Sequence, residues 1–430
     1  MKIIKFGGSS VAKLDRIKQV TAIVNDLYLT SPELVVVVSA LGGVTDLLVK
    51  AGEEAVSRDE NYKNTFAEIK KRHEDIAQEL EVFLPKIHDP MRDNFNDLHD
   101  LLHGVFLVQE LSKRALDELM SYGERLSAYL LACALQQTLP QAKFFDAREF
   151  IKTDRNFGSA KVDYEKTYAL IRKKIHSQDC LPIITGFIGS SETKETTTLG
   201  RGGSDFTASI LAAALGAEEI QIWTDVDGVM TADPKKVKQA FPLAQMSYKE
   251  AMEISHFGAK VIYPPTIMPA CLANIPIRIK NTFNPAAPGT WISATASNQT
   301  MPICGISSIS DISLLRVEGS GIVGVSGMSK RLFTALAERS INIMLITQGS
   351  SEHSICVAIT PECALSAKEA TEKEFAFDMQ AGLIDPIIVE NGLSIIAIVG
   401  EQMRNTPGVT GTLFGALARN GINIEVIAQG

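Results

Sequence analysis

The stretch Lys5-Phe6-Gly7-Gly8-Ser9-Ser10 combines residue types that can hold a phosphate group. Paired glycines let backbone N–H groups turn toward an anion without Cβ obstruction, and a helix that follows adds the positive end of its dipole. Lys5 precedes the turn, where its ammonium can stabilise bridging oxygens during phosphoryl transfer. The GxxxxGK[ST] spacing of a P-loop is absent, and two glycines alone fit a plain tight turn equally well.

A second glycine pair, Gly42-Gly43, lies among hydroxyls in Ser39-Ala40-Leu41-Gly42-Gly43-Val44-Thr45-Asp46. This stretch follows a β-branched run, and ligands of open α/β sheets bind at the carboxyl ends of strands. Two such turns in one sheet point to a ligand more strongly than one. Thr45 or Asp46 would equally suit a simple helix N-cap.

The third motif, Gly200-Arg201-Gly202-Gly203-Ser204-Asp205, is the richest stretch in the chain. Arg201 offers a planar fork that suits a carboxylate, and the glycines let the backbone approach a ligand. Three glycines, an Arg and an Asp in six residues are poor packing material. We therefore favour a ligand site over a capped helix with a surface arginine.

A fourth motif places an acidic turn after a strand, from Trp223 through Thr224 and Asp225 to Met230. Lys235 and Lys260 follow downstream and are candidate phosphate ligands in an acidic protein. For each lysine taken alone, a solvated surface position is the simpler interpretation.

The elements around these motifs predict an α/β sandwich with a mainly parallel sheet. Strand-like runs alternate with helical spacing, as in βαβ units. The expected strands are Lys2–Phe6, Leu34–Val38, Ala142–Phe145, Leu181–Ile188 and Glu219–Thr224, and residues 59–135 are expected to be mostly helical. The Pro/Gly-rich passage Asn284–Gly289 places the end of this domain near residue 295.

An internal repeat begins past residue 300. Leu332–Ala337 returns as Leu413–Ala418, and Ile341–Ile343 returns as Ile422–Ile424, each at an offset of 81 residues. Each copy indicates strand, helix and strand, and the second copy lacks a counterpart of the strand expected over Ser354–Ile359. A sheet edge left without that strand would be unpaired, so we expect either a longer natural protein or a trimmed chain.

Composition excludes several classes of function. A net charge of −8 removes the global electrostatic footprint of a nucleic-acid binder. The six cysteines form no CxxC pair and the seven histidines no HExxH motif, so we expect reduced thiols and no structural metal. The N-terminus does not look like a signal peptide and no apolar stretch reaches about 18 residues, so we expect a cytoplasmic protein without a membrane span.

Taken in order and spacing, the motifs resemble those of the aspartate kinases, which have the amino-acid kinase fold, a three-layer α/β/α sandwich. The matching stretches are KFGGSS, VVVVSALGGVTDLL, MSYGERLSA, TLGRGGSDFTA, WTDVDGVMTADP and SHFGAKVIYPPT. The repeated units resemble tandem α+β ACT domains, the ligand-sensing modules of the same enzymes. The resemblance implies a kinase domain over residues 1–295, a first ACT unit with its linker over 296–390, and a truncated second unit over 391–430.

The resemblance also implies residue roles. Lys5 and Asp205 would be catalytic, with Lys5 stabilising charge on the transferring group and Asp205 organising the lysines or the Mg²⁺-bound nucleotide. ATP would be bound by Lys5, Gly7, Gly8, Ser9, Thr224, Asp225, Met230, Lys235, Lys260 and Val261. Aspartate would be held by Ser39, Thr45, Glu124, Arg201 and Ser204. Mg²⁺ would be held chiefly by the ATP phosphates, without a protein cage.

In that family the reaction moves the γ-phosphate of ATP onto the β-carboxylate of L-aspartate, the first step toward lysine, threonine and methionine. Arg201 would suit the α-carboxylate and Glu124 the α-ammonium of the substrate. Two positions depart from the usual pattern, because family members often have Tyr at Met230 and Arg at Lys235. These departures weaken any expectation of adenine stacking or of bidentate phosphate binding.

The regulatory half resembles threonine-sensing members, in which Asn342, Gln348 and Gln429 would meet the effector. Lysine-sensing members tend to have an acidic residue near the position of Met344. A buried ammonium needs such a partner, and Met344 cannot supply it. Threonine is therefore favoured over lysine. The threonine-sensing subset commonly carries a homoserine dehydrogenase after its sensing half, and ACT edges imply a homodimer or homotetramer.

Two competing hypotheses stay open. Another amino-acid kinase, acting on glutamate, acetylglutamate or a nucleotide, would share the glycine turns but not MSYGER or the ACT pair. A catalytically silent amino-acid sensor would bind ligand without turning over ATP. Intact Lys5, Arg201 and Asp205 argue against the sensor.

Overall fold

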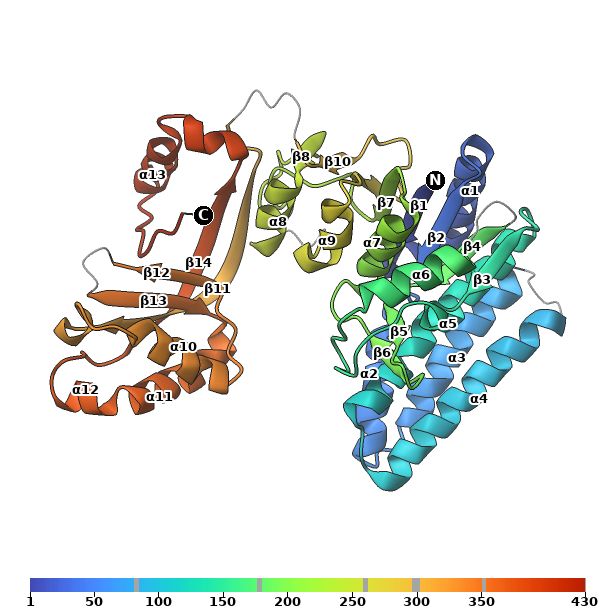
Figure 1. The fold of residues 1–430 in the computed structure, drawn as a ribbon, viewed down its shortest axis with the longest axis horizontal. Helices are drawn as coiled ribbons and strands as arrows, with labels where there is room; N and C mark the ends of the chain where they lie inside the picture. Colours follow the sequence, from blue (N-terminus) through green and yellow to red (C-terminus); the bar gives the residue numbers. More distant parts are fainter. Residues whose placement is uncertain (81–84, 176–179, 258–261, 296–301, 350–352, 430) are drawn as a thin grey trace. The chain divides into compact units, whose positions relative to one another are not determined.

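The computed structural model describes residues 1–80, 85–175, 180–257, 262–295, 302–349 and 353–429. The chain divides into two compact units, residues 1–300 and 301–430, which are described separately (Figure 1). No helix among the described residues combines the length and the apolar character that crossing a bilayer requires.

The first unit is built on an eight-stranded sheet in the order β3-β4-β2-β1-β7-β9-β10-β8. The strands β3, β4, β2, β1, β7 and β9 run parallel to one another, and β10 and β8 run antiparallel to them. The strands are β1 (Lys2–Phe6), β2 (Leu34–Val38), β3 (Ala142–Phe145), β4 (Leu181–Thr185), β7 (Glu219–Thr224), β8 (Gln245–Ser247), β9 (Ile277–Asn281) and β10 (Thr290–Ser293). A separate hairpin joins β5 (Ile188–Ser190) to β6 (Thr196–Thr198).

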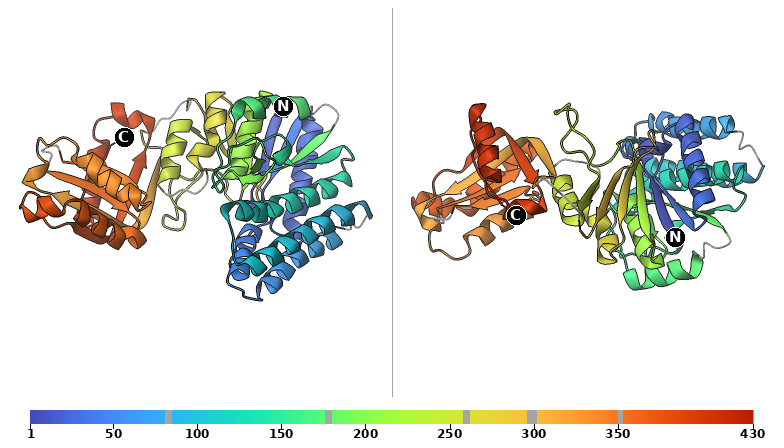
Figure 2. Two further views of the ribbon diagram at one scale, coloured as in Figure 1. Left: turned by 60° about the horizontal axis from the view of Figure 1, so that its bottom comes forward. Right: turned by 90° about the horizontal axis from the view of Figure 1, so that it is seen from above.

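Helices cover both faces of this sheet (Figures 1 and 2). They are α1 (Leu14–Thr30), α2 (Val44–Val56), α3 (Tyr62–Glu79), α4 (Pro85–Val108), α5 (Lys113–Gln136), α6 (Tyr164–Lys174), α7 (Gly203–Leu215), α8 (Tyr248–His256) and α9 (Pro264–Leu272). One face packs against a core shared by α1 to α5, and α7 packs on the other face together with α6 and α9. The predicted three-layer amino-acid kinase architecture is confirmed.

Strand pleating decides which face each residue of β1 serves. Successive side chains point to opposite faces, so Ile4 and Phe6 enter the core beneath α1 to α5. Lys5 therefore points to the face that carries α7, and it is buried there with its ammonium against that helix. A lysine inside a parallel strand is expensive unless it meets an opposite charge.

One predicted strand is wrong in extent. The expected strand Leu181–Ile188 ends at Thr185, and Gly186-Phe187 form a turn before β5 begins at Ile188. Gly186 is pressed against Ser204, since a Cβ there would lie 2.6 Å from the Ser204 Cβ. Phe187 has φ of +68°, a strained value for an aromatic residue, and cannot continue a strand.

The second unit contains a four-stranded antiparallel sheet in the order β12-β13-β11-β14. Its elements are β11 (Gly305–Glu318), α10 (Met328–Glu338), β12 (Leu345–Gln348), β13 (Ser354–Ile359), α11 (Ala364–Glu374), α12 (Ala376–Gln380), β14 (Ile388–Val399) and α13 (Val409–Arg419). α10 and α11 bury an apolar core against the sheet. The predicted α+β ACT architecture is confirmed.

The repeat is only partly realised in this sheet. β11, α10 and β12 form the first copy, whereas the second copy forms β14 and α13 but no strand over residues 422–429. The predicted second strand of that copy is therefore wrong. β12 exists because it pairs with β13, and no strand among the described residues plays the part of β13 for the second copy. The division of this unit at residue 390 stays a prediction.

Candidate active site

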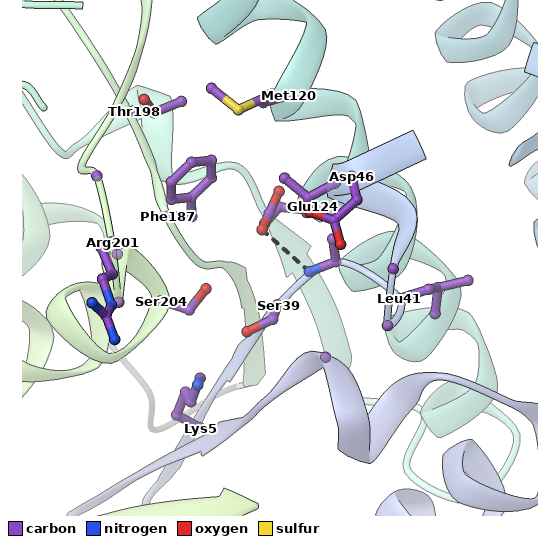
Figure 3. Close-up of a pocket in the computed structure, with 18 of the residues that line it drawn as sticks. Lys5, Ser39, Leu41, Asp46, Met120, Glu124, Phe187, Thr198, Arg201 and Ser204 are labelled. Carbon is purple, nitrogen blue, oxygen red and sulfur yellow. Dashed lines mark hydrogen bonds between the residues drawn. The ribbon is translucent and has the colours of Figure 1, made fainter. Parts of the chain in front are cut away.

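A cavity of about 520 Å³ lies at the carboxyl ends of β1 and β2 (Figure 3). Residues from all three of the first glycine motifs line it, together with residues of α5. Of the predicted site residues, those lining the cavity are Lys5, Gly8, Ser39, Thr45, Glu124, Arg201 and Ser204. The structure thus brings together all five predicted aspartate contacts and the predicted catalytic lysine.

Lys5 and Asp205 form an ion pair at the floor of the site. The Lys5 Nζ lies 2.6 Å from the Asp205 Oδ1, and both side chains are nearly buried, at 11% and 12% exposure. Asp205 lies in the first turn of α7, so the ammonium of β1 and the start of this helix are held together. Such a pair keeps a charged lysine in place in a sheet that has little water around it.

The turns after β1 and β2 are packed directly on each other. A Cβ on Gly8 would lie 3.0 Å from the Ala40 carbonyl oxygen, and one on Gly42 would lie 3.0 Å from the Gly8 carbonyl oxygen. Glycine is therefore required by close approach at both positions. Gly43, with φ of +81°, is the N-cap residue just before α2, and no side-chain hydrogen bond caps that helix. The alternative that Thr45 or Asp46 is the N-cap is wrong, and both residues line the cavity.

Glu124 projects from α5 into the cavity and is 4% exposed. Its Oε1 accepts a hydrogen bond of 3.2 Å from the Ala40 backbone N–H (Figure 3). Its Oε2 is buried and has no hydrogen-bond partner among the described residues. Burial raises the pKa of Glu124 to about 8, although the Ala40 N–H and the charge of Lys5 favour the ionised form. A buried acceptor of this kind suits an incoming ammonium group.

The arginine-bearing turn lies at the N-terminus of α7, opposite Glu124 in the close-up (Figure 3). Gly202 has φ of +71°, and a Cβ on Gly203 would lie 2.6 Å from the Phe187 Cδ2, so the turn depends on both glycines. The Arg201 guanidinium is exposed and lies 5.4 Å from the centre of the Tyr263 ring. A guanidinium beside a helix N-terminus is a good site for a carboxylate.

The remaining predicted nucleotide contacts that the structure describes do not line this cavity. Gly7 donates its N–H to the Trp223 carbonyl at 3.2 Å, which places the end of β7 beside the first glycine turn. Thr224 and Asp225 follow directly at that end, where their side chains share a 3.1 Å hydrogen bond. Lys235 is an exposed residue of the next loop.

Four further residues were predicted to contact the nucleotide, and the structure describes two of them. Ser9 lies in the single turn Gly8–Val11, and Met230 bridges to Pro242. Lys260 and Val261 lie outside the described residues. The proposed nucleotide roles of all of these residues stay predictions.

Sequence reasoning gave no role to several residues that shape the cavity. Met120, Phe187 and Thr198 line it, and Arg72 of α3 donates to the Gly42 carbonyl at 2.7 Å. Met120 lies one helical turn before Glu124, so helical periodicity within MSYGER would have found it. Arg72 lies in the charged run KKRHED, which looks like a solvated helix face.

The predicted regulatory residues all lie in the second unit and are exposed: Asn342, Gln348 and Gln429. The Thr347 hydroxyl donates to the Ile427 carbonyl at 3.2 Å, so the segments that end in the two glutamines run against each other. This contact joins corresponding parts of the two repeat copies, although only one of them is a strand.

No group of three or more His, Cys, Asp or Glu side chains within the described ranges is arranged to hold a metal ion. A Mg²⁺ bound through nucleotide phosphates needs no such cluster, so the predicted magnesium is neither supported nor opposed by this observation.

The parallel sheet and the cavity at the carboxyl ends of its strands indicate an amino acid kinase. Comparison with known families agrees. Residues 1–281 match the amino acid kinase family, and residues 315–375 and 396–430 match an ACT domain. The bifunctional aspartokinase/homoserine dehydrogenase 2 of Arabidopsis thaliana is 37% identical over 99% of this chain and 47% of its own length. Aspartokinase 1 of the same plant is 35% identical over all of this chain and 75% of its own length.

Comparison with solved structures also finds an aspartokinase. Escherichia coli aspartokinase III in complex with aspartate and ADP matches all of this chain and 94% of its own, at 30% identity and a TM-score of 0.83. The same enzyme in complex with lysine and aspartate matches with 29% identity and a TM-score of 0.78, over all of this chain and 93% of its own. The chain belongs to the aspartokinase family. It spans about half the length of the bifunctional relatives that it matches.

Proposed function

We propose that this chain is an aspartate kinase, which transfers the γ-phosphate of ATP to the β-carboxylate of L-aspartate and gives 4-phospho-L-aspartate. One observation carries the proposal. A single cavity is lined by a buried carboxyl, one of whose oxygens has no partner among the described residues, by an arginine at a helix N-terminus, and by a lysine that pairs with Asp205 beside a glycine turn. Family membership supports the same reaction.

The arrangement divides the substrate among three groups. Glu124 takes the α-ammonium through its Oε2, and Arg201 takes the α-carboxylate together with the N-terminus of α7. The β-carboxylate then points toward Lys5, where the γ-phosphate arrives. Lys5 offsets charge on the transferring group, and Asp205 holds the ammonium in position. Positioning and electrostatics are the main demands of phosphoryl transfer, so no covalent intermediate is needed.

ATP would lie along the first glycine turn, with its phosphates on the backbone of Gly7 and Gly8 and its nucleoside toward Thr224 and Asp225. The contact between Gly7 and Trp223 supports this direction, because it makes the two strand ends neighbours. Mg²⁺ would come with the phosphates and neutralise charge between the β- and γ-phosphoryl groups. E. coli aspartokinase III is named as a complex with aspartate and ADP, which supports this pair of ligands.

A coupled assay of ADP release tests the proposal. Aspartate should support turnover, whereas glutamate, one methylene longer, should give a far lower kcat/KM. Turnover with glutamate or acetylglutamate but not aspartate would establish the competing amino-acid kinase. Aspartate binding by calorimetry without any ADP release would establish the silent sensor.

Feedback inhibition belongs to the same proposal, with threonine favoured over lysine as the effector. Met344, which cannot pair with an ammonium, supports this preference, and so does similarity to bifunctional relatives. A solved structure of E. coli aspartokinase III is a complex with lysine and aspartate, so lysine is the main alternative to threonine as the effector. Titrating activity and melting temperature with threonine, lysine and methionine separates them. No response to millimolar threonine would reject this part of the proposal.

The assembly and the compartment complete the proposal. A homodimer or homotetramer would form through the ACT sheet, since β12 and β14 are its edge strands. Sedimentation at several concentrations would test it, and a purely monomeric chain would reject it. The cytoplasm stays the predicted compartment.

A further inference from the structure

Asp117 is a fully buried carboxylate of α5 that accepts three hydrogen bonds, all from the wall of the cavity. Its Oδ2 accepts from the Gly158 N–H at 3.0 Å and from the Thr198 N–H at 2.9 Å. Its Oδ1 accepts from the Thr198 hydroxyl at 2.8 Å. Its exposure is 0%, and both donor residues line the cavity. Neither sequence reasoning nor family resemblance assigned it a role.

These bonds connect α5 to the turn that carries Arg201. Thr198 ends β6 three residues before Arg201, and its carbonyl accepts from the Ala160 N–H at 2.9 Å. Gly158 supports the turn from behind, because a Cβ on Gly200 would lie 3.3 Å from the Gly158 carbonyl oxygen. Movement of Asp117 would therefore move the loop, the strand end and the arginine turn together.

The same helix carries the other half of the recognition site. Glu124 lies seven residues after Asp117, about two helical turns, so the two carboxyls share a face of α5 with Met120 between them. Glu124, at one end of this face, points into the cavity. Asp117, at the other end, accepts hydrogen bonds from Thr198, which precedes the turn that carries Arg201. The separation between Glu124 and Arg201 is thus set through Asp117.

A carboxylate at this place gives more stiffness than a neutral acceptor would. Hydrogen bonds to an ionised group are shorter and about twice as strong as neutral ones. All three donors are uncharged, and burying an anion among neutral donors costs free energy. Burial accordingly raises the pKa of Asp117. A position that needed only packing would be served as well by an apolar side chain.

We propose that Asp117 is a positioning residue for the amino-acid substrate, which fixes the distance between the groups that bind its α-ammonium and its α-carboxylate. The proposal rests on the proposed function of the cavity. It predicts that loosening Asp117 weakens recognition of aspartate and lets the longer glutamate compete better, while the nucleotide side is unaffected.

The test is Asp117→Asn, assayed for ADP release with aspartate and glutamate. The amide oxygen can accept from the two N–H groups and the amide nitrogen can donate to the Thr198 hydroxyl, so the variant removes the charge and weakens all three hydrogen bonds without displacing the donors. We expect the KM for aspartate to rise about 10-fold, or about 1.4 kcal/mol. We expect the KM for ATP to change less than about 2-fold and the preference for aspartate over glutamate to fall about 5-fold.

Asp154→Asn is the matched control. Asp154 lies on the exposed side of the same loop, and its Oδ1 accepts from the Asn156 and Lys161 N–H groups at 3.1 and 2.9 Å. It makes the same kind of bond but does not line the cavity. Its loss should leave both KM values and the substrate preference unchanged.

The possible results separate this inference from the proposed function. No aspartate turnover by the wild-type chain would reject the proposed function itself. Wild-type turnover with an Asp117→Asn variant that only melts earlier, or whose KM values for aspartate and ATP rise equally, would overturn the positioning role. If that variant does not fold, Thr198→Val removes only the hydroxyl bond. It should raise the KM for aspartate about 3-fold with the KM for ATP unchanged, and an unchanged KM for aspartate would then overturn the inference.

Discussion

The protonation of Glu124 predicts how strongly aspartate binding depends on pH. This carboxyl has a pKa of about 8, because it is buried and, among the described residues, only one of its oxygens accepts a hydrogen bond. The neutral form predominates at pH 7. An ammonium group binds the ionised form, so under the proposed assignment aspartate would displace a proton from Glu124 when it enters.

The size of the effect follows from the fraction of ionised carboxyl. With a pKa of about 8, roughly 1% is ionised at pH 6 and roughly half at pH 8. A site that is competent only when ionised has an affinity reduced by that fraction. The KM for aspartate should therefore fall about 50-fold between pH 6 and pH 8, while the KM for ATP stays nearly constant.

Initial rates of ADP release measured between pH 6 and pH 8 check this, together with calorimetry in buffers of different ionisation enthalpy. Calorimetry should show about one proton released per aspartate bound at pH 6.5. The control is Glu124→Gln, which keeps an acceptor for Ala40 but cannot ionise. It should bind aspartate weakly and without this pH dependence. A wild-type KM for aspartate that is flat over the range, with no proton release, would refute the assignment of Glu124.

The same raised pKa makes the stability of the protein depend on pH. The folded state of Glu124 holds its proton more tightly than the unfolded chain, so its contribution to stability is present below pH 4.5 and is lost as the pH rises toward about 8. Melting temperatures of the wild type relative to Glu124→Gln should therefore fall across that window. Saturating aspartate should remove the difference at pH 8.

Three further perturbations follow from the site and from the helices that support it. Lys5→Ala should lower kcat at least about 100-fold, or about 2.7 kcal/mol, in the protein that remains folded. Lys2→Ala, at the other end of β1, should not lower kcat, and near-normal turnover by Lys5→Ala would remove that lysine from the mechanism. Arg72→Met should raise the KM for aspartate about 5-fold, because the guanidinium no longer holds the Gly42 carbonyl, and kinetics identical to wild type would contradict this. Burial lowers the pKa of His73 to about 4, so its contribution to stability is present above pH 6.5 and is lost as the pH falls toward 4. The wild type should lose about 3 kcal/mol over that range relative to His73→Leu in chemical denaturation, and parallel pH profiles would show that the imidazole does not titrate in this way.

Much of the fold is encoded locally. The run Leu34–Val38 is a buried strand because five apolar residues, four of them β-branched, fit between two covered faces, and the observed bounds match the predicted ones. The convergence of the first two glycine motifs was predictable too, because each follows a strand whose carboxyl end meets the same edge of the sheet. The third motif follows β6 of the separate hairpin, so its approach to that edge was not predictable in the same way.

The misses have a common physical cause, which is dependence on partners far away in sequence. Arg72 gains its role from a carbonyl 30 positions earlier, and Asp117 from donors 41 and 81 positions later. Phe187 lies in an apolar run that looks like one strand, yet the approach of α7 forces a turn there. The segment after Ile422 has strand-like composition but no partner strand among the described residues. Composition cannot reveal any of these contacts.

The charged groups around the cavity are placed so that they would exchange partners when the proposed substrates bind. Lys5 is neutralised by Asp205, Glu124 is mainly protonated at pH 7, and Arg201 is exposed to solvent. This limits unpaired charge in a buried site of a protein whose net charge is −8. Phosphate oxygens would compete with Asp205 for Lys5, and the substrate ammonium would take the place of the proton on Glu124. Each exchange would replace a contact within the protein by a contact with a ligand. Lys5 and Glu124 would therefore both contact ligands only when ATP and aspartate are bound together.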